Sequence, residues 1–158
     1  MALRLPWIRD MAKRILVPIS PRMPSDPFMT VLGDLARGAG ATVRLLHVAA
    51  SPTNVVDEDG RIVAYADQER FRLQAEGHDL LQVVNLTLGG ESVDVGVRFG
   101  DPVTEILAEA ADFGADLIVL GTGDRRRFPF RGGVAWEVLR RTEVPIALLR
   151  SSRRDGAA

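Results

Sequence analysis

Residues 115–123 read Ala-Asp-Leu-Ile-Val-Leu-Gly-Thr-Gly, and this stretch decides the fold. The apolar run 117–120 is typical of a buried strand, and the glycines after it permit a tight turn. Downstream, Gly132 and Gly133 open a helical segment that reaches about Arg141. A strand, a glycine turn and a glycine-led helix N-terminus together make a place for an anion, usually a phosphate. The stretch therefore predicts an anion site at the end of a strand.

The rest of the chain alternates between strand and helix patterns. Apolar or alternating runs predict strands at 14–19, 43–48, 93–99, 116–120 and 144–149. Helical spacing of apolar residues predicts helices at about 26–38, 67–88, 102–113 and 133–141. Such alternation indicates an α/β fold, and right-handed crossovers make its parallel sheet doubly wound, with helices on both faces.

Three of these segments are predicted in more detail. The first helix places an apolar stripe on one face, made by Phe28, Val31, Leu32 and Leu35. The second helix has the stripe Leu73, Leu80, Leu81, Val84 and Leu88. Gly77 lies inside that second helix and costs about 1 kcal/mol relative to alanine. Residues 49–65 are expected to form a loop with the polar tip Asp57-Glu58-Asp59-Gly60.

Composition excludes several classes of function. The 158 residues are 46% hydrophobic and 26% charged, with a net charge of −1, so no whole-protein field favours nucleic acid or membrane. Without cysteine, disulfides, thiol chemistry and cysteine metal sites are excluded. No apolar run is long enough to span a membrane, and residues 1–13 do not resemble a signal peptide. We therefore expect a cytoplasmic protein.

The expected domain organisation is simple. Residues 1–12 form an N-terminal extension, in which Met11 is an alternative start, and residues 13–150 form one domain. Residues 151–158 are a polar tail, which we expect to be disordered. Ligands of doubly wound sheets bind beyond the carboxyl ends of the strands. Those ends are expected at Ser20, Val48, Gly100 and Gly121.

Taken together, these motifs resemble those of the universal stress protein family. The likeness covers about residues 13–150 and lies in the order and spacing of motifs at 14–19, 45–48, 100–102, 115–122, 132–135 and 144–149. The resemblance implies a five-stranded parallel sheet of order 3-2-1-4-5, homodimers and, in one subclass, bound ATP.

The ATP-binding subclass of that family allows a comparison residue by residue. Its pattern is matched by Pro18, Val48, Leu120, Gly121, Gly132 and Val134. Ser20, however, stands where the subclass has an aspartate, and Gly133 stands where a serine or threonine offers its hydroxyl to phosphate. Asp124 replaces the second glycine of the turn, and the following loop is two residues short. These departures predict weak or absent ATP binding.

An arginine-rich loop follows the glycine turn, with Arg125, Arg126, Arg127 and Arg131. Residues 124–131 hold four arginines and one aspartate, a local charge of +3. Two interpretations stay open: the arginines bind a triphosphate, another anion or an acidic partner, or they form a solvated loop without ligand. Asp124 is interpreted as a turn residue or as the ion-pair partner of a neighbouring arginine.

Other catalytic and ligand motifs are weak or missing. Gly121-Thr122-Gly123 is only half of a dinucleotide fingerprint, and Lys13, the sole lysine, lies far from any P-loop pattern. His47 is interpreted as a hydrogen-bonded strand histidine and His78 as a residue of a solvated helix face. The run at 57–59 lacks the spacing of a calcium loop, and no pattern suggests a metal site. We find no pairing of nucleophile and base.

The last strand predicts a homodimer. Its apolar run carries Pro145, which favours an edge of the sheet, and an uncovered apolar edge promotes association. The resemblance implies that the same strand of a second copy covers it, through Val144, Ile146 and Leu148.

We therefore expect a non-enzymatic stress-response binding and interaction module without a certain cofactor. An alternative is an ATP or other nucleotide sensor that uses the arginine-rich loop for phosphates, with slow hydrolysis at most. A third hypothesis is a module for anions or acidic partners without specificity for adenine. Neither nucleic acid nor membrane is an expected partner.

Overall fold

The computed structural model describes residues 12–20, 26–89, 92–122 and 133–150. Five parallel strands form the sheet: β1 (Arg14–Pro18), β2 (Thr42–Ala49), β5 (Val93–Phe99), β6 (Leu117–Thr122) and β7 (Ile146–Arg150). Four helices connect them: α2 (Asp26–Ala39), α3 (Ala66–Leu88), α4 (Pro102–Phe113) and α5 (Val134–Arg141). The sheet order β5-β2-β1-β6-β7 confirms the predicted order 3-2-1-4-5.

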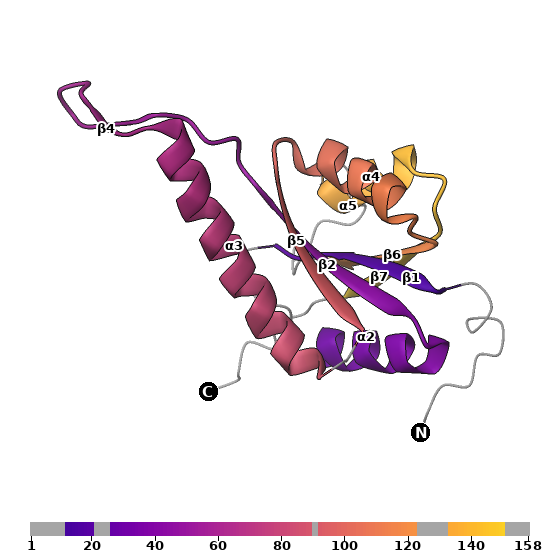
Figure 1. Ribbon diagram of the computed structural model, residues 1–158. Coiled ribbons are helices and arrows are strands. Elements are labelled where there is room, and N and C mark those ends of the chain that lie inside the picture. Colours follow the sequence, from indigo (N-terminus) through magenta and orange to yellow (C-terminus); the bar gives the residue numbers. More distant parts are fainter. Residues whose placement is uncertain (1–11, 21–25, 90–91, 123–132, 151–158) are drawn as a thin grey trace, which may run out of the picture.

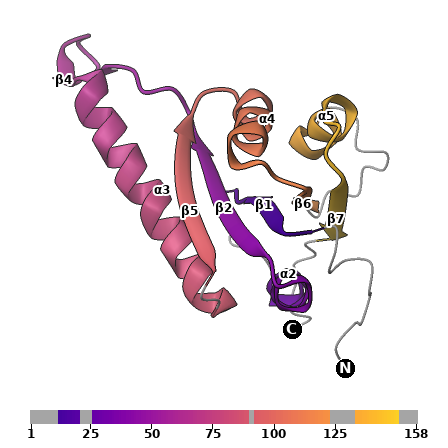
Figure 2. The ribbon, with the colours of Figure 1, turned by 45° about the vertical axis from the view of Figure 1, so that its right-hand side comes forward.

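Helices cover both faces of the sheet, with α2 and α3 on one side and α4 and α5 on the other (Figures 1 and 2). Each face has its own apolar cluster, and β1 contributes to both. Ile15 and Val17 pack toward α2 and α3, whereas Leu16 packs toward α4. Because side chains alternate along a strand, a central strand covered on both faces is a continuous apolar run.

Two sequence-based expectations are wrong in detail. The predicted loop 49–65 contains an antiparallel hairpin of β3 (Val55–Val56) and β4 (Ile62–Ala64). The Asp57 carboxylate closes its turn by accepting hydrogen bonds from the backbone N–H of Asp59 and Arg61, at 3.0 and 2.8 Å. In α2, Val31 is 47% exposed and Met29 is buried, because the buried face lies slightly to one side of the predicted stripe.

The ends of the chain lie largely beyond the described residues. Ala12, the last residue of the predicted extension, packs into the core, whereas residues 1–11 and the predicted tail 151–158 lie outside the described residues. Within the described ranges, no helix combines the length and apolar character that a membrane crossing requires.

Gly77 lies where α3 packs tightly against the sheet. A Cβ at this position would lie 2.8 Å from His47 Cδ2 and 3.0 Å from Val97 Cγ2. Real Cβ atoms essentially never come that close to another heavy atom. Glycine lowers the helix propensity of this segment, but the packing of α3 against β2 and β5 requires it at position 77.

Gly77→Ala should destabilise the protein despite the better helix propensity of alanine. The clash with His47 and Val97 is expected to lower the free energy of unfolding by about 1–3 kcal/mol. Gly38→Ala is the matched control, because Gly38 lies in α2 with nothing within 4 Å of the added Cβ. The control should gain about 0.5 kcal/mol from helix propensity. Urea unfolding of both variants measures these changes. An equal gain in the free energy of unfolding for Gly77→Ala and Gly38→Ala would contradict the predicted clash.

Candidate functional site

The candidate site lies where the chain switches from one side of β1 to the other. β2 and β5 lie on one side of β1, while β6 and β7 lie on the other. Ligands of doubly wound sheets bind at this switch point, beyond the carboxyl ends of the strands. In the described structure, registered pairing of β1 with β6 covers only Ile15↔Leu117 and Leu16↔Ile118. The carboxyl ends of β1 and β6 therefore flank the switch point without being held together by a continuous ladder.

Asp116 ties β1 to β6 at their opposite, amino-terminal ends. Its two carboxylate oxygens accept hydrogen bonds from the backbone N–H of Lys13 and Arg14, at 2.9 and 3.0 Å. The two strands are thus joined where they start, away from the candidate site.

Ile19 fixes the exit of the chain from β1. Its backbone N–H donates to the carbonyl oxygen of Leu46 at 2.7 Å, and its own carbonyl oxygen lies 3.2 Å from His47 Nδ1. Because a carbonyl oxygen only accepts, the proton of this hydrogen bond resides on Nδ1. His47 is thus a hydrogen-bonded strand histidine, as predicted. Ser20 follows directly and is exposed.

The predicted strand-end residues play unequal roles. Leu120 is buried and Val48 is half-buried, and both pack in the cluster beneath α4 and α5. Their side chains therefore belong to the core, so that Leu120 is available to a ligand only through its backbone. Pro18 is also half-buried, whereas Gly121 is exposed.

Phe28 is a residue of this region that the sequence patterns do not reveal. A Cβ on Gly121 would lie 3.3 Å from Phe28 Cε2, so the ring packs directly against the end of β6. In the sequence, Phe28 carries only a helical apolar signal, and its partner lies 93 positions away. A side chain at position 121 would press on this buried ring.

The start of α5 supplies the helix terminus that the sequence predicted. Gly133 is its N-cap, with extended backbone at φ −87° and ψ 158° and without a side-chain cap. Val134 follows and is exposed. The remaining loop residues of the predicted site, Asp124, Arg125, Arg126, Arg127, Arg131 and Gly132, lie outside the described residues.

Asp101 caps the helix that follows β5. Its carboxylate accepts hydrogen bonds from the Thr104 backbone N–H at 2.9 Å and from the Thr104 hydroxyl at 2.8 Å. The backbone hydrogen bond, and then the hydroxyl, lower the pKa of the Asp101 carboxyl. This carboxylate is therefore engaged in starting α4, with Pro102 in the first turn as predicted.

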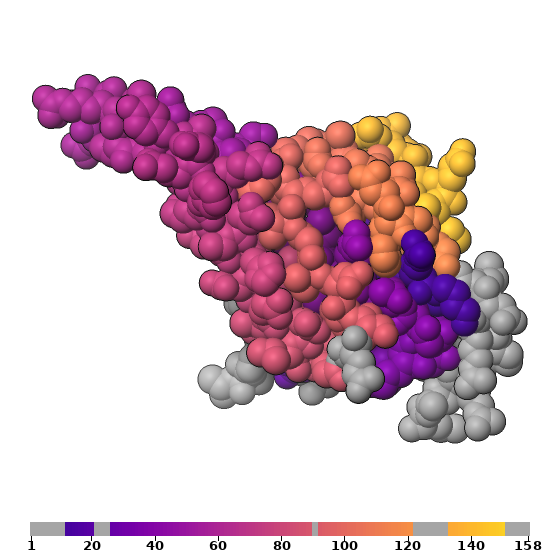
Figure 3. All heavy atoms as spheres, viewed as in Figure 1, coloured from indigo at the N-terminus to yellow at the C-terminus, as the bar shows by residue number. Residues whose placement is uncertain are grey.

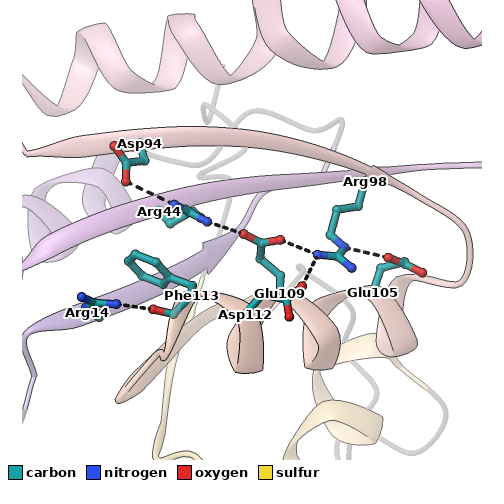
Figure 4. Close-up of polar contacts among 8 residues, drawn as sticks. All are labelled: Arg14, Arg44, Asp94, Arg98, Glu105, Glu109, Asp112 and Phe113. Atoms are coloured by element: carbon teal, nitrogen blue, oxygen red, sulfur yellow. Dashed lines mark hydrogen bonds and ion pairs between the residues drawn. The ribbon is translucent and has the colours of Figure 1, made fainter.

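A charged clamp holds α4 on β2 and β5 (Figure 4). Glu109 of α4 is only 7% exposed, and its two carboxylate oxygens accept from Arg44 Nη1 and Arg98 Nη1, each at 2.7 Å. Arg98 also donates to Glu105 at 2.7 Å, and the Arg44 guanidinium lies 4.4 Å from the centre of the Phe113 ring. The clamp positions β2 and β5, whose carboxyl ends border the candidate site.

The clamp changes the ionisation of its members. Burial alone raises the pKa of the Glu109 carboxyl, but the hydrogen bonds from Arg44 and Arg98 outweigh burial and leave that pKa below its usual range. The hydrogen bond to Glu109 in turn raises the pKa of Arg44. Glu109 is therefore ionised at neutral pH. Among the described residues, no three histidine, aspartate or glutamate side chains gather as metal ligands.

Known proteins resemble this chain in sequence pattern and in fold. Residues 11–150 match the model of the universal stress protein family. No curated protein matches the sequence. A solved universal stress protein in complex with cAMP has a TM-score of 0.65 and 16% identity, covering 90% of this chain and 99% of its own.

Two further solved structures have the same fold. Universal stress protein UspA from Lactobacillus plantarum has a TM-score of 0.62 and 19% identity, covering 88% of this chain and 98% of its own. A universal stress protein from Archaeoglobus fulgidus in complex with dAMP has a TM-score of 0.53 and 18% identity, with coverages of 87% and 98%.

Glu109→Gln should destabilise the protein at neutral pH by about 2 kcal/mol, because two partly buried guanidinium groups lose the carboxylate they share. Arg98 keeps Glu105 and Asp112, and Arg44 keeps Asp94 at 3.4 Å. The pKa of Glu109 is lower in the folded than in the unfolded chain, so its ionised form stabilises the fold above about pH 4.3. That contribution is lost as the pH falls through the folded-state pKa. Urea unfolding from pH 7 to pH 3 should therefore show the two proteins converging in acid. A difference that is independent of pH would contradict the clamp.

Proposed function

The chain belongs to the universal stress protein family, and on that premise we propose that it is a non-enzymatic binding and interaction module. In this proposal it acts in the cytoplasm as a homodimer, and its affinity for ATP is weak or absent.

The chemistry of the switch point supports this proposal. Ser20, at the exit from β1, brings a hydroxyl to the position where ATP-binding relatives have a carboxylate. Gly133 brings no side chain to the start of α5, so the N-cap residue itself offers an incoming anion only its backbone. Of the described polar side chains nearby, Asp101 caps α4 and His47 donates to Ile19. Neither of these two side chains is arranged as a nucleophile with its base, which acyl or phosphoryl transfer to the protein requires.

A second candidate function is nucleotide sensing. Two solved structures of the same fold are complexes with cAMP and dAMP. The arginine-rich sequence 124–131, with a net charge of +3, supplies cations that suit phosphate groups. In this alternative, the four loop arginines bind the phosphates in place of the carboxylate and the hydroxyl that Ser20 and Gly133 do not supply. The same loop without adenine specificity would make an anion or acidic-partner module.

Freshly purified protein should contain no stoichiometric nucleotide, and calorimetric titration should show no ATP binding below millimolar concentration. The physical reason is that Ser20 and Gly133 leave the nucleotide-binding pattern without one carboxylate and one hydroxyl. Micromolar affinity, which corresponds to about −8 kcal/mol, would overturn the proposal in favour of the sensor.

Two sets of variants separate the candidates. Ser20→Asp combined with Gly133→Ser introduces the missing groups and should create measurable ATP binding if the remaining scaffold is competent. Replacing the four arginines of the loop by alanine should abolish any binding that the wild type shows. Retention of binding in that variant would exclude the arginine mechanism. Binding of inorganic polyphosphate that weakens steeply with salt would favour the anion module.

We also propose that two copies associate through β7. This strand lies at an edge of the sheet, as expected from Pro145, whose carbonyl oxygen accepts from the Ile118 backbone N–H just before the strand. Of the predicted interface residues, Leu148 is 41% exposed, whereas Val144 and Ile146 pack partly against the cluster beneath α4 and α5. Backbone pairing of two such edges, with Leu148 at the seam, would cover both.

Leu148→Glu should break this association, because two symmetry-related carboxylates would then meet at the seam. We expect the dissociation constant to rise at least about tenfold, or roughly 1.4 kcal/mol. Light scattering should show a mass that falls below the wild-type mass by one or more units of the 17.2 kDa chain. Val31→Glu is the control, since Val31 is similarly exposed but lies on α2. Equal masses for wild type and Leu148→Glu would contradict the role of β7.

A further inference from the structure

An arm projects from the body of the molecule at one end of the sheet (Figures 1 and 3). We define it as residues 53–76, which comprise the hairpin of β3 and β4 and the first half of α3. The 23 residues of α3 span about 34 Å, longer than any strand of the sheet. The first half of the helix touches the end of β5 through Arg70, whose guanidinium lies 4.5 Å from the centre of the Phe99 ring. The buried residues of α3 all follow the arm: Gly77, Leu81, Val84 and Leu88.

The arm is nevertheless held in a defined shape by its own hydrogen bonds. At its base, the Asn54 side-chain carbonyl accepts from the Ala66 backbone N–H at 2.8 Å. At the helix start, the Tyr65 backbone N–H donates to Gln68 Oε1 at 3.1 Å. At its tip, Asp57 closes the turn. The hairpin and the helix are thus joined into one extended unit.

The arm exposes several large apolar side chains beside its charged residues. Its exposed apolar residues are Val55, Val56, Ile62, Val63, Tyr65 and Phe71, of which Phe71 is 75% exposed. Val55 and Val56 are successive residues of β3 and therefore point to opposite faces of the hairpin, with Ile62 on the face of Val56. Counted over both faces, the six residues expose on the order of 500 Å² of apolar surface. The largest apolar patch of a typical soluble monomer covers about 300–600 Å² and is often functional. Neither the switch point nor β7 makes use of these side chains.

We propose that the arm is a second association surface and that the arm of another copy of this chain covers it, in an antiparallel arrangement about a twofold axis. A hairpin of two strands is marginally stable alone, and both of its edges are open to further pairing. Pairing with an identical hairpin gives a four-stranded sheet. An ordinary interface takes about 800 Å² from each partner, so the apolar side chains that face the other copy supply part of one side and the paired hairpin backbones add to it.

Charge selects the antiparallel orientation. The tip carries Asp57, Glu58 and Asp59, so a parallel arrangement would bring six carboxylates together. The antiparallel arrangement separates the two tips and directs each along α3 of the other copy, where Arg70 is exposed. The arm as a whole contains six acidic and three basic residues. Association of two such arms is driven by apolar contact against like net charge, so screening by salt should strengthen it.

The experiment measures the mass of the full chain in a Leu148→Glu background, which removes the proposed β7 contact. Light scattering at micromolar concentration, in low and in high salt, should show a dimer that is favoured by high salt. Adding Val63→Asp and Phe71→Ser should convert it to a monomer. Both positions are exposed, so circular dichroism and the urea midpoint should stay unchanged. Leu86→Ser, at an 81% exposed position of α3 beyond the arm, should leave the mass unchanged.

Three results would overturn the proposal. The first is a Leu148→Glu protein that is monomeric at every salt concentration. The second is a dimer that the arm substitutions do not affect. The third is an arm-dependent dimer that weakens with salt, because the arm would then contact an oppositely charged surface. If β7 does not associate at all, the arm substitutions should convert the wild-type dimer itself to a monomer. The two association proposals can therefore fail independently.

Discussion

A single buried carboxylate organises the face of the sheet that α4 covers. Glu109 lies between Arg44 of β2 and Arg98 of β5, and these arginines also contact Asp94, Glu105 and Asp112. A charge buried there is tolerated only when it is fully paired, and its directional hydrogen bonds admit one placement of the helix over the two strands. Arg44 stands near the start of β2 and Arg98 near the end of β5, so the clamp fixes the direction of α4 as well as its position.

The geometry of the candidate site follows from this arrangement. With β2 and β5 held by α4, the carbonyl of Leu46 and the ring of His47 form a rigid border against which Ile19 leaves β1. Across the switch point, Gly121 is set by the packed ring of Phe28. The described edge thus presents backbone and small groups in fixed positions.

Much of this architecture can be predicted from local patterns in the amino-acid sequence. Apolar runs locate all five strands of the sheet, and Asp101-Pro102 marks the start of α4, because burial and capping are local in sequence. The clamp is not predictable in this way, since Arg44 and Glu109 are 65 positions apart and each looks like an ordinary surface residue. The hairpin escapes prediction because its strands are only two and three residues long. At the site, the contact of Phe28 with Gly121 depends on tertiary packing in the same way.

The contact between Gly77 and His47 also restricts how this chain can change over evolutionary time. With only hydrogen at position 77, α3 lies close enough to β2 for the imidazole to fill the space beneath it. The two positions therefore cannot vary independently. A methyl group at 77 is compatible with this spacing only when the side chain at 47 is smaller, and a smaller side chain there gives up the hydrogen bond to Ile19. The exit of β1 at Ile19 and the packing of α3 at Gly77, 58 positions later, are thus inherited as one trait.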